Sequence, residues 1–132
     1  MVYPFRVLAI DDSPHIRILM TKLLKRFGFE TVETAENGKL GLDKFATFKP
    51  HAVFLDGIMP EMDGLSVLRA IKAQSPITVV VITSSLSERE KVLQFKESGA
   101  DFYLMKPFEE SKFHEVAQKA LAVLESRAQV SQ

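Results

Sequence analysis

Cysteine is absent from the 132-residue sequence, so neither a disulfide framework nor a thiolate metal site can form. An excess of charge is absent as well, because Lys+Arg and Asp+Glu each number 17 and the net charge is zero. This balance argues against a protein dedicated to nucleic acid, since phosphate contacts require a basic face. Apolar runs such as Val79 to Ile82 are far too short to span a bilayer.

We also expect no secretory signal, because Met1 to Asp11 has no basic start followed by an apolar stretch. We therefore expect a cytoplasmic protein that binds neither a membrane nor nucleic acid directly. The apolar content of 46% and the charged content of 26% are typical of a globular protein. With no internal repeat or linker, we expect one domain over residues 1–126 and a frayed tail over residues 127–132.

Strand-like and helix-like segments alternate along the chain. Four apolar residues lead into Asp56, which predicts a strand over 52–56 that is buried on both faces. Further strands are predicted over 5–10, 30–35, 78–83 and 101–105. Each is followed by a predicted helix, and these start at Ser13-Pro14, Lys39, Asp63-Gly64, a Ser87/Glu90 capping box and near Phe113. Five such repeats predict an α/β fold, with a parallel sheet covered by helices on both faces.

Chemically useful residues stand at the ends of the predicted strands. The first strand ends in Asp11-Asp12, the third in Asp56, the fourth in Thr83 and the fifth in Lys106. All parallel strands place their carboxyl ends on one rim of the sheet, where ligands of such folds bind. We therefore expect these residues to lie together, although each alone has an ordinary explanation as a cap, strand or loop residue.

The combination favours phosphoryl transfer. Three crowded carboxylates repel one another and favour proton uptake by one of them unless a cation joins them. Oxygen ligands without cysteine or clustered histidine suit Mg²⁺, with Mn²⁺ as an alternative. Thr83 adds a hydroxyl and Lys106 a positive charge, so a metal, a cation, a hydroxyl donor and a carboxylate nucleophile are all present.

The chain resembles the receiver domains of bacterial two-component response regulators over residues 5 to 126. The matching residues are Asp11-Asp12-Ser13, DGIMPEMDG from Asp56 to Gly64, Thr83-Ser84, and GADFYLMKPF from Gly99 to Phe108. The resemblance implies a flavodoxin-like, doubly wound (βα)5 three-layer sandwich with sheet order 2-1-3-4-5.

The resemblance also implies the role of each site residue. Asp56 accepts a phosphoryl group from a phosphohistidine on a sensor histidine kinase or phosphotransfer protein. Asp12 and Asp56 bind Mg²⁺, Asp11 acts through water, and the Ile58 backbone carbonyl completes the metal site. Lys106 and Thr83 bind phosphate oxygens, and the Lys106–Pro107 bond is cis. The protein is then a phosphoacceptor rather than an enzyme, with slow self-dephosphorylation that the apolar Ile58 side chain does not accelerate.

The expected switch follows from the added charge on Asp56. Thr83 is drawn toward the phosphate, and Tyr103, otherwise a half-buried strand aromatic, turns inward. The output face lies over residues 87–126 and binds a downstream protein, the chain being a monomer or an activation-dependent dimer. Early apolar residues of the first helix, Ile16 or Met20, are candidates for kinase contact. We expect His15, His51 and His114 to be surface residues rather than ligands.

Three other interpretations stay open at this point. A haloacid-dehalogenase-like phosphatase also uses a strand-end aspartate, but it requires a second acid where this chain has Ile58. A flavodoxin-like FMN carrier requires a hydroxyl-rich phosphate loop, and Asp11-Asp12 would repel that phosphate. The sequence is also compatible with a receiver excised from a longer DNA-binding or enzyme-linked regulator, as well as with a chemotaxis-type single-domain receiver.

Overall fold

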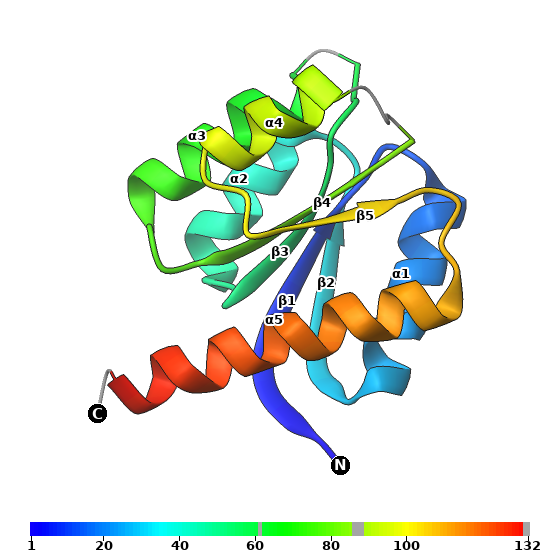
Figure 1. Cartoon of the computed structure of the whole chain (residues 1–132), viewed down its shortest axis with the longest axis vertical. Coiled ribbons are helices and arrows are strands. Elements are labelled where there is room, and N and C mark those ends of the chain that lie inside the picture. Colours follow the sequence, from blue (N-terminus) through cyan, green and yellow to red (C-terminus); the bar gives the residue numbers. More distant parts are fainter. Residues whose placement is uncertain (61, 86–88, 131–132) are drawn as a thin grey trace.

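Five strands and five helices alternate in the computed structural model, which describes residues 1–60, 62–85 and 89–130 (Figure 1). The elements are β1 (Tyr3–Ile10), α1 (Pro14–Phe27), β2 (Phe29–Ala35), α2 (Gly38–Phe48), β3 (Ala52–Asp56), α3 (Gly64–Gln74), β4 (Val79–Ser84), α4 (Arg89–Glu97), β5 (Phe102–Met105) and α5 (Glu110–Val130). The strands form one parallel sheet in the order β2-β1-β3-β4-β5, which confirms the expected fold class and topology.

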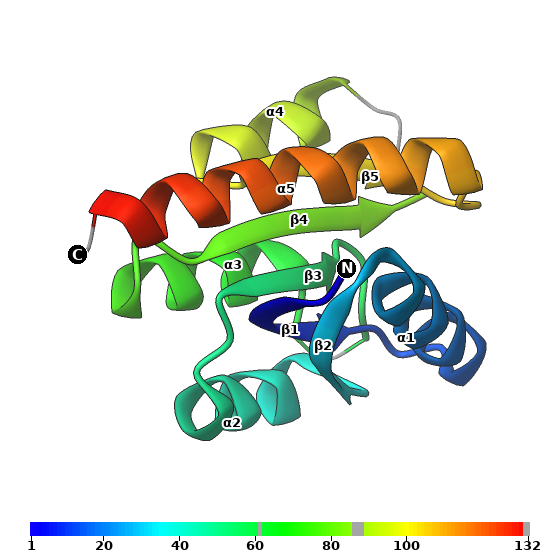
Figure 2. The ribbon, with the colours of Figure 1, turned by 90° about the horizontal axis from the view of Figure 1, so that it is seen from below.

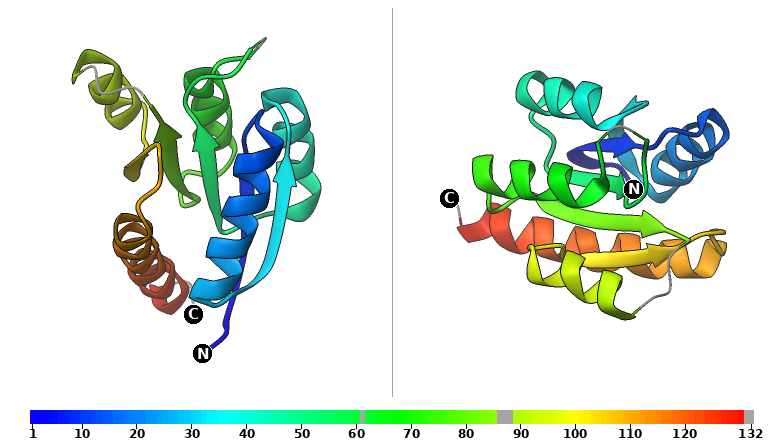
Figure 3. Two further views of the ribbon diagram at one scale, coloured as in Figure 1. Left: turned by 90° about the vertical axis from the view of Figure 1, so that its right-hand side faces the viewer. Right: turned by 90° about the horizontal axis from the view of Figure 1, so that it is seen from above.

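Helices cover both faces of the sheet (Figures 1 and 3), and the sheet separates the hydrophobic core into two clusters. On one face α1 and α5 pack against alternate strand residues such as Val7 and Phe54. On the other face α2, α3 and α4 pack against the intervening residues, such as Leu8 and Leu55. Every residue of β3 and β4 is buried, as a strand between two helix layers requires. Figure 2 shows α5 running along the sheet beside β4 and β5.

Side-chain caps fix where three helices begin. Ser13, Asn37 and Asp63 accept hydrogen bonds from the backbone N–H groups three residues ahead, at 3.3, 2.8 and 2.8 Å respectively. Each cap satisfies a backbone donor that the helix itself leaves unpaired. Of the predicted Ser87/Glu90 capping box, Ser87 lies outside the described residues and Glu90 lies in the first turn of α4.

Helix α5 continues as far as Val130, into the residues 127–132 that the sequence predicts to fray. Arg127 explains the difference, because its guanidinium donates to the carbonyl of Ile77 and lies 3.5 Å from a carboxylate oxygen of Asp101. The first helix also departs from the sequence analysis. Met20 is buried and unable to meet a partner, whereas its neighbour Leu19 is exposed. Within the described ranges no helix is both long and apolar enough to cross a membrane.

His51 takes part in the sheet instead of lying free on the surface as we expected. Its side-chain Nδ1 accepts a hydrogen bond from the backbone N–H of Arg6 at 2.9 Å, and the backbone N–H of His51 donates to the Arg6 carbonyl at 2.8 Å. These two bonds lie where the β1–β2 register shifts between Tyr3 and Arg6. Burial, followed by the Arg6 charge, lowers the pKa of His51. Protonation would also leave Nδ1 unable to accept the N–H of Arg6.

This contact makes part of the stability depend on pH. A histidine whose pKa is lowered in the folded state stabilises the fold above its unfolded pKa, and that contribution is lost as the pH falls below about 6.5. We expect His51→Ala to lower the free energy of unfolding by about 1 kcal/mol at pH 7.5 and by much less at pH 5. Urea unfolding of both proteins at each pH measures the difference. The exposed His15 is the control, since His15→Ala should show no such trend.

Candidate functional site

Two buried acids and one lysine meet at the carboxyl ends of the strands. Asp11 follows β1, Asp56 ends β3 and Lys106 follows β5. The Lys106 ammonium lies 2.7 Å from Oδ2 of Asp11 and 3.5 Å from Oδ2 of Asp56. Both aspartates are 3% exposed. The predicted gathering at one rim is therefore present, and the lysine offsets part of the negative charge of the two acids.

Backbone donors hold the other carboxylate oxygen of each acid. Oδ1 of Asp11 accepts the N–H of Ser13 at 2.9 Å, and Oδ1 of Asp56 accepts the N–H of Ile58 at 3.0 Å. Arg17, one turn into α1, donates to the Asp11 carbonyl at 2.8 Å. The role of Arg17 could not be predicted from the sequence, because an arginine on a helix surface carries no local signal of this contact.

A third acid makes the cluster suitable for a metal ion. Carboxylate oxygens of Asp11, Asp12 and Asp56 lie within 4.8 Å of one another, and Asp12 is exposed while the other two are buried. Hard oxygen donors at this spacing match Mg²⁺, which is held by few carboxylates and keeps several waters. An exposed third ligand leaves one side of the cluster accessible to a phosphate oxygen.

Asp56 is the acid whose titration this environment changes most clearly. Burial raises the pKa of Asp56 to about 6 from 3.8, and the charge of Asp11 and a hydrogen bond with Asp12 add to the rise. The N–H of Ile58 and the charge of Lys106 act in the opposite direction. The raised pKa makes Asp56 the acid at which the expected proton uptake is favoured, with burial rather than repulsion as the larger cause of the rise.

Metal binding should therefore weaken in mild acid. Below pH 6 a proton occupies Asp56 and competes with Mg²⁺, so each further unit should raise the Mg²⁺ dissociation constant about tenfold. Above pH 7 Asp56 is ionised and the constant should be nearly independent of pH. Isothermal titration calorimetry between pH 5 and 8 measures this. Asp56→Asn, which cannot take up the proton, should lose the dependence around pH 6, and an unchanged profile in that variant would contradict the assignment.

The remaining predicted residues lie on β4 and β5 and directly after β3 and β5. Thr83 is buried and stands directly opposite Asp56 in the β3–β4 register. The Ile58 side chain is half exposed, and its predicted lack of influence on dephosphorylation stays a prediction. The Lys106–Pro107 peptide bond is cis. Tyr103 is half-buried on β5, with its ring centroid 6.4 Å from that of Phe95.

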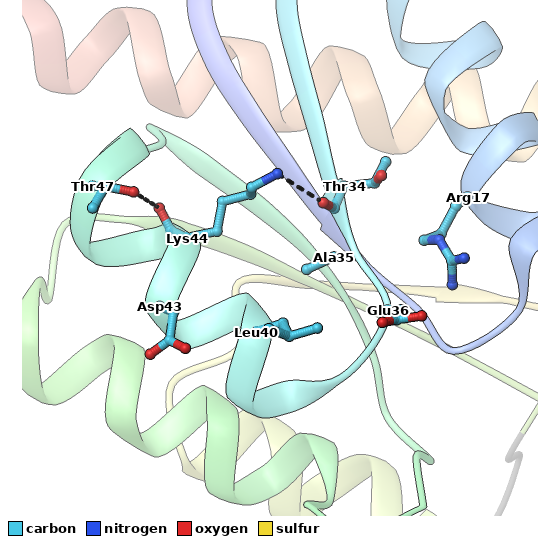
Figure 4. A pocket seen from close by; sticks show the side chains of 8 residues that line it. All are labelled: Arg17, Thr34, Ala35, Glu36, Leu40, Asp43, Lys44 and Thr47. Carbon is cyan, nitrogen blue, oxygen red and sulfur yellow. Dashed lines mark hydrogen bonds between the residues drawn. The ribbon is translucent and has the colours of Figure 1, made fainter.

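An open hollow lies beside this cluster rather than over it. It measures about 560 Å³ and is open to solvent between α1 and α2. Figure 4 shows Arg17 on one side of it and Leu40, Lys44 and Thr47 of α2 on the other, with Thr34 of the edge strand β2 between them. Lys44 covers part of the exposed edge of β2, because its ammonium donates a hydrogen bond to the Thr34 carbonyl at 3.4 Å and lies 3.2 Å from Oε1 of Glu33.

A family model described as the response regulator receiver domain matches residues 7–118, the part of the chain that holds all of these residues. The chain belongs to this family. It is a phosphoacceptor signalling domain of the two-component type, and the resemblance found in the sequence is confirmed. Receiver domains bind Mg²⁺ in an acidic pocket, and Asp11, Asp12 and Asp56 form such a pocket here.

Individual relatives of this receiver include short and long chains. Chemotaxis protein CheY of Bacillus subtilis is 32% identical over 116 residues, which are 88% of this chain and 97% of that protein. The structure of CheY4 of Vibrio cholerae has a TM-score of 0.83 at 30% identity and covers 89% of this chain and 99% of its own. NtrX of Brucella abortus has a TM-score of 0.89 at 30% identity, but the match covers 98% of this chain and 29% of NtrX. Similar receivers thus occur alone and as one part of longer proteins.

Proposed function

We propose that Asp56 is the phosphoacceptor and that it receives its phosphoryl group from a phosphohistidine of a sensor histidine kinase or phosphotransfer protein. One observation carries this proposal: Asp56 and Asp11 are both buried acids of the carboxylate cluster close to the Lys106 ammonium, and of these two it is Asp56 that stands opposite Thr83 in the β3–β4 register. A carboxylate oxygen of Asp56 forms the new bond to phosphorus while the nitrogen–phosphorus bond to the donor imidazole breaks. The imidazole leaves with the electron pair of that bond.

Residues around Asp56 have distinct roles in this transfer. Asp11, Asp12, Asp56 and the Ile58 carbonyl are the proposed Mg²⁺ ligands, and a bound Mg²⁺ neutralises charge on the transferring phosphoryl oxygens. Lys106 is placed to donate a charge-assisted hydrogen bond to a second phosphoryl oxygen. The Ile58 N–H holds Oδ1 of Asp56 and so orients the carboxylate before the donor arrives. Thr83, beside Asp56 in the register, supplies a hydroxyl to the third oxygen.

Phosphorylation then changes the surface formed by α4, β5 and α5. A phosphoryl group gives Asp56 nearly two negative charges in place of one, which attracts the Thr83 hydroxyl. Thr83 and Tyr103 lie on the neighbouring strands β4 and β5, so a displacement at Thr83 is close to the strand that holds the Tyr103 ring. We infer that a downstream protein binds this surface once Asp56 is phosphorylated.

Helix α1 of this chain offers a suitable surface for the phosphodonor protein beside Asp56. Ile18 and Leu19 of α1 are 58% and 39% exposed, and they replace the buried Met20 as candidates for this contact. The helix has five basic residues and no acidic residue, the basic ones being His15, Arg17, Lys22, Lys25 and Arg26. A donor surface that combines apolar and acidic side chains would complement α1 while its phosphohistidine faces Asp56.

Incubation with acetyl phosphate tests the acceptor directly. We expect intact mass spectrometry to show one phosphoryl group per chain in the presence of Mg²⁺ and none when the metal is chelated. Asp56→Asn should lose the adduct completely, whereas Asp43→Asn, at an exposed acid of α2, should keep it. An adduct that persists in Asp56→Asn would refute the assignment. Repeated turnover of phosphate esters, with loss of turnover in Asp56→Asn, would support the phosphatase alternative instead.

A further inference from the structure

Gly57, the residue directly after the acceptor, leaves a space that an aromatic ring of α4 approaches. A Cβ atom added at Gly57 would lie 3.1 Å from Cζ and 3.3 Å from Cε2 of Phe95. It would also lie 3.3 Å from Cγ2 of Ile82 on β4. These separations are shorter than normal packing distances between carbon atoms. The Phe95 ring therefore lies against the acceptor segment itself.

Gly57 has little freedom to move away from that ring. Its N–H donates to the Thr83 carbonyl at 2.9 Å, which ties it to β4. On another side the start of α3 comes so close that a Cβ at Gly64 would lie 2.7 Å from Cα of Gly57. Any displacement of residue 57 or of its neighbour Thr83 is thus transmitted to the atoms that surround it, and Phe95 is among them.

Phe95 is also the main apolar attachment of its helix. All nine residues of α4 are described, and Phe95, at 5% exposure, is the one that is buried among them. Val92 is partly buried, and Leu93 points outward and is half exposed. The Phe95 ring belongs to the core cluster beneath α2, α3 and α4 and lies beside Tyr103. One side chain therefore contacts the acceptor segment, the helix of the output face and the aromatic residue of β5.

We propose that Phe95 is a positioning residue that couples the placement of α4 to the conformation of the acceptor segment through the space left by Gly57. A change at residues 56–57 moves the ring, and the ring moves the helix to which it belongs. The coupling is reciprocal, so a protein that displaces α4 also changes the free energy of the acceptor segment. The relevance of this coupling to signalling rests on the proposed phosphorylation of Asp56. The contact between Phe95 and Gly57 is independent of that proposal.

The contact can be tested in metal-free, unphosphorylated protein. Gly57→Ala should displace the Phe95 ring and shift the backbone amide resonances of α4, residues 89–97, in ¹H–¹⁵N spectra. Phe95→Leu shortens the side chain, so the double variant Gly57→Ala/Phe95→Leu should differ little in α4 from Phe95→Leu alone. Leu93→Ala is the control on the same helix, and in that background the effect of Gly57→Ala should persist. Equal α4 shifts with and without Phe95 would overturn the proposal.

Beryllofluoride, which mimics the phosphoryl group in the presence of Mg²⁺, tests the reciprocal effect. We expect Gly57→Ala to change the beryllofluoride dissociation constant about fivefold or more when Phe95 is present, and less than twofold in the Phe95→Leu background. The same change in both backgrounds would contradict the coupling. Failure of the unmodified protein to bind beryllofluoride would refute the proposed function, and the metal-free amide shifts would still decide for or against Phe95.

Discussion

Lys106→Ala is expected to tighten Mg²⁺ binding while it slows phosphorylation of Asp56. The Lys106 ammonium lies 2.7 Å from Asp11 and 3.5 Å from Asp56, so it neutralises the same carboxylates that hold the metal. Its removal should lower the Mg²⁺ dissociation constant about threefold to tenfold at pH 8 and moderate salt. The phosphoryl oxygens lose a cation at the same time, which should reduce the rate with acetyl phosphate about 100-fold.

Opposite changes in these two measurements separate a direct role from general damage. Calorimetry gives the Mg²⁺ affinity, and phosphorylation is timed by mass spectrometry at saturating Mg²⁺. Lys106→Arg keeps the charge and serves as the matched control, and it should lie close to the unmodified protein in Mg²⁺ affinity. If Lys106→Ala weakens Mg²⁺ binding and slows phosphorylation to the same extent, Lys106 acts through the fold of the site rather than on the phosphoryl group.

Of the substitutions that add a single methyl group near the site, Gly64→Ala is expected to lower the free energy of unfolding the most. Gly64 opens α3, and an added Cβ would lie 2.5 Å from the Asp56 carbonyl oxygen and 2.7 Å from Cα of Gly57. These are backbone atoms of the acceptor segment, held by β4, so they have little room to move. We expect a loss of about 3 kcal/mol in the free energy of unfolding, measured by urea denaturation, and weaker phosphorylation in the molecules that remain folded.

Gly38 provides a matched control for that variant. It is also buried, opens α2 and follows a capping residue, Asn37. An added Cβ there would meet side-chain atoms, 2.8 Å from Cγ2 of Val67 and 3.1 Å from Met62, rather than backbone. Gly38→Ala should therefore cost only about 1 kcal/mol. Equal losses in the two variants would show that Gly64 matters as a helix start and not through its approach to Asp56.

The parallel sheet and the rim that holds the site could be anticipated because they depend on patterns that the chain repeats, whereas the strand order was implied by the family resemblance. Buried parallel strands are continuous apolar runs, and each run ends at the same rim, so Asp11, Asp56 and Lys106 meet whatever the loops do. Spacing alone also suggested the metal cluster. The carboxylates of Asp12 and Asp56 are close because β1 and β3, which precede them, are neighbours in the sheet.

Contacts between distant surfaces could not be anticipated in this way. Helical spacing places Leu19 and Met20 on adjacent positions of one broad stripe, and only the packing of α1 on the sheet decides that Met20 is buried and Leu19 exposed. The end of α5 depends on Arg127 reaching Asp101, a partner 26 residues earlier in the chain. His51 carries no ligand spacing, yet its Nδ1 replaces a backbone acceptor for Arg6.

The central claim is that one metal and one phosphoryl group are bound together around Asp56. A crystal structure with Mn²⁺ and beryllofluoride tests it most directly, because anomalous scattering locates Mn²⁺ without reference to any assumed ligand. We predict one anomalous peak beside Asp12, Asp56 and the Ile58 carbonyl, with beryllofluoride on the Asp56 carboxylate within reach of Lys106 and Thr83. Metal bound elsewhere, or beryllofluoride bound to a different carboxylate, would contradict this account.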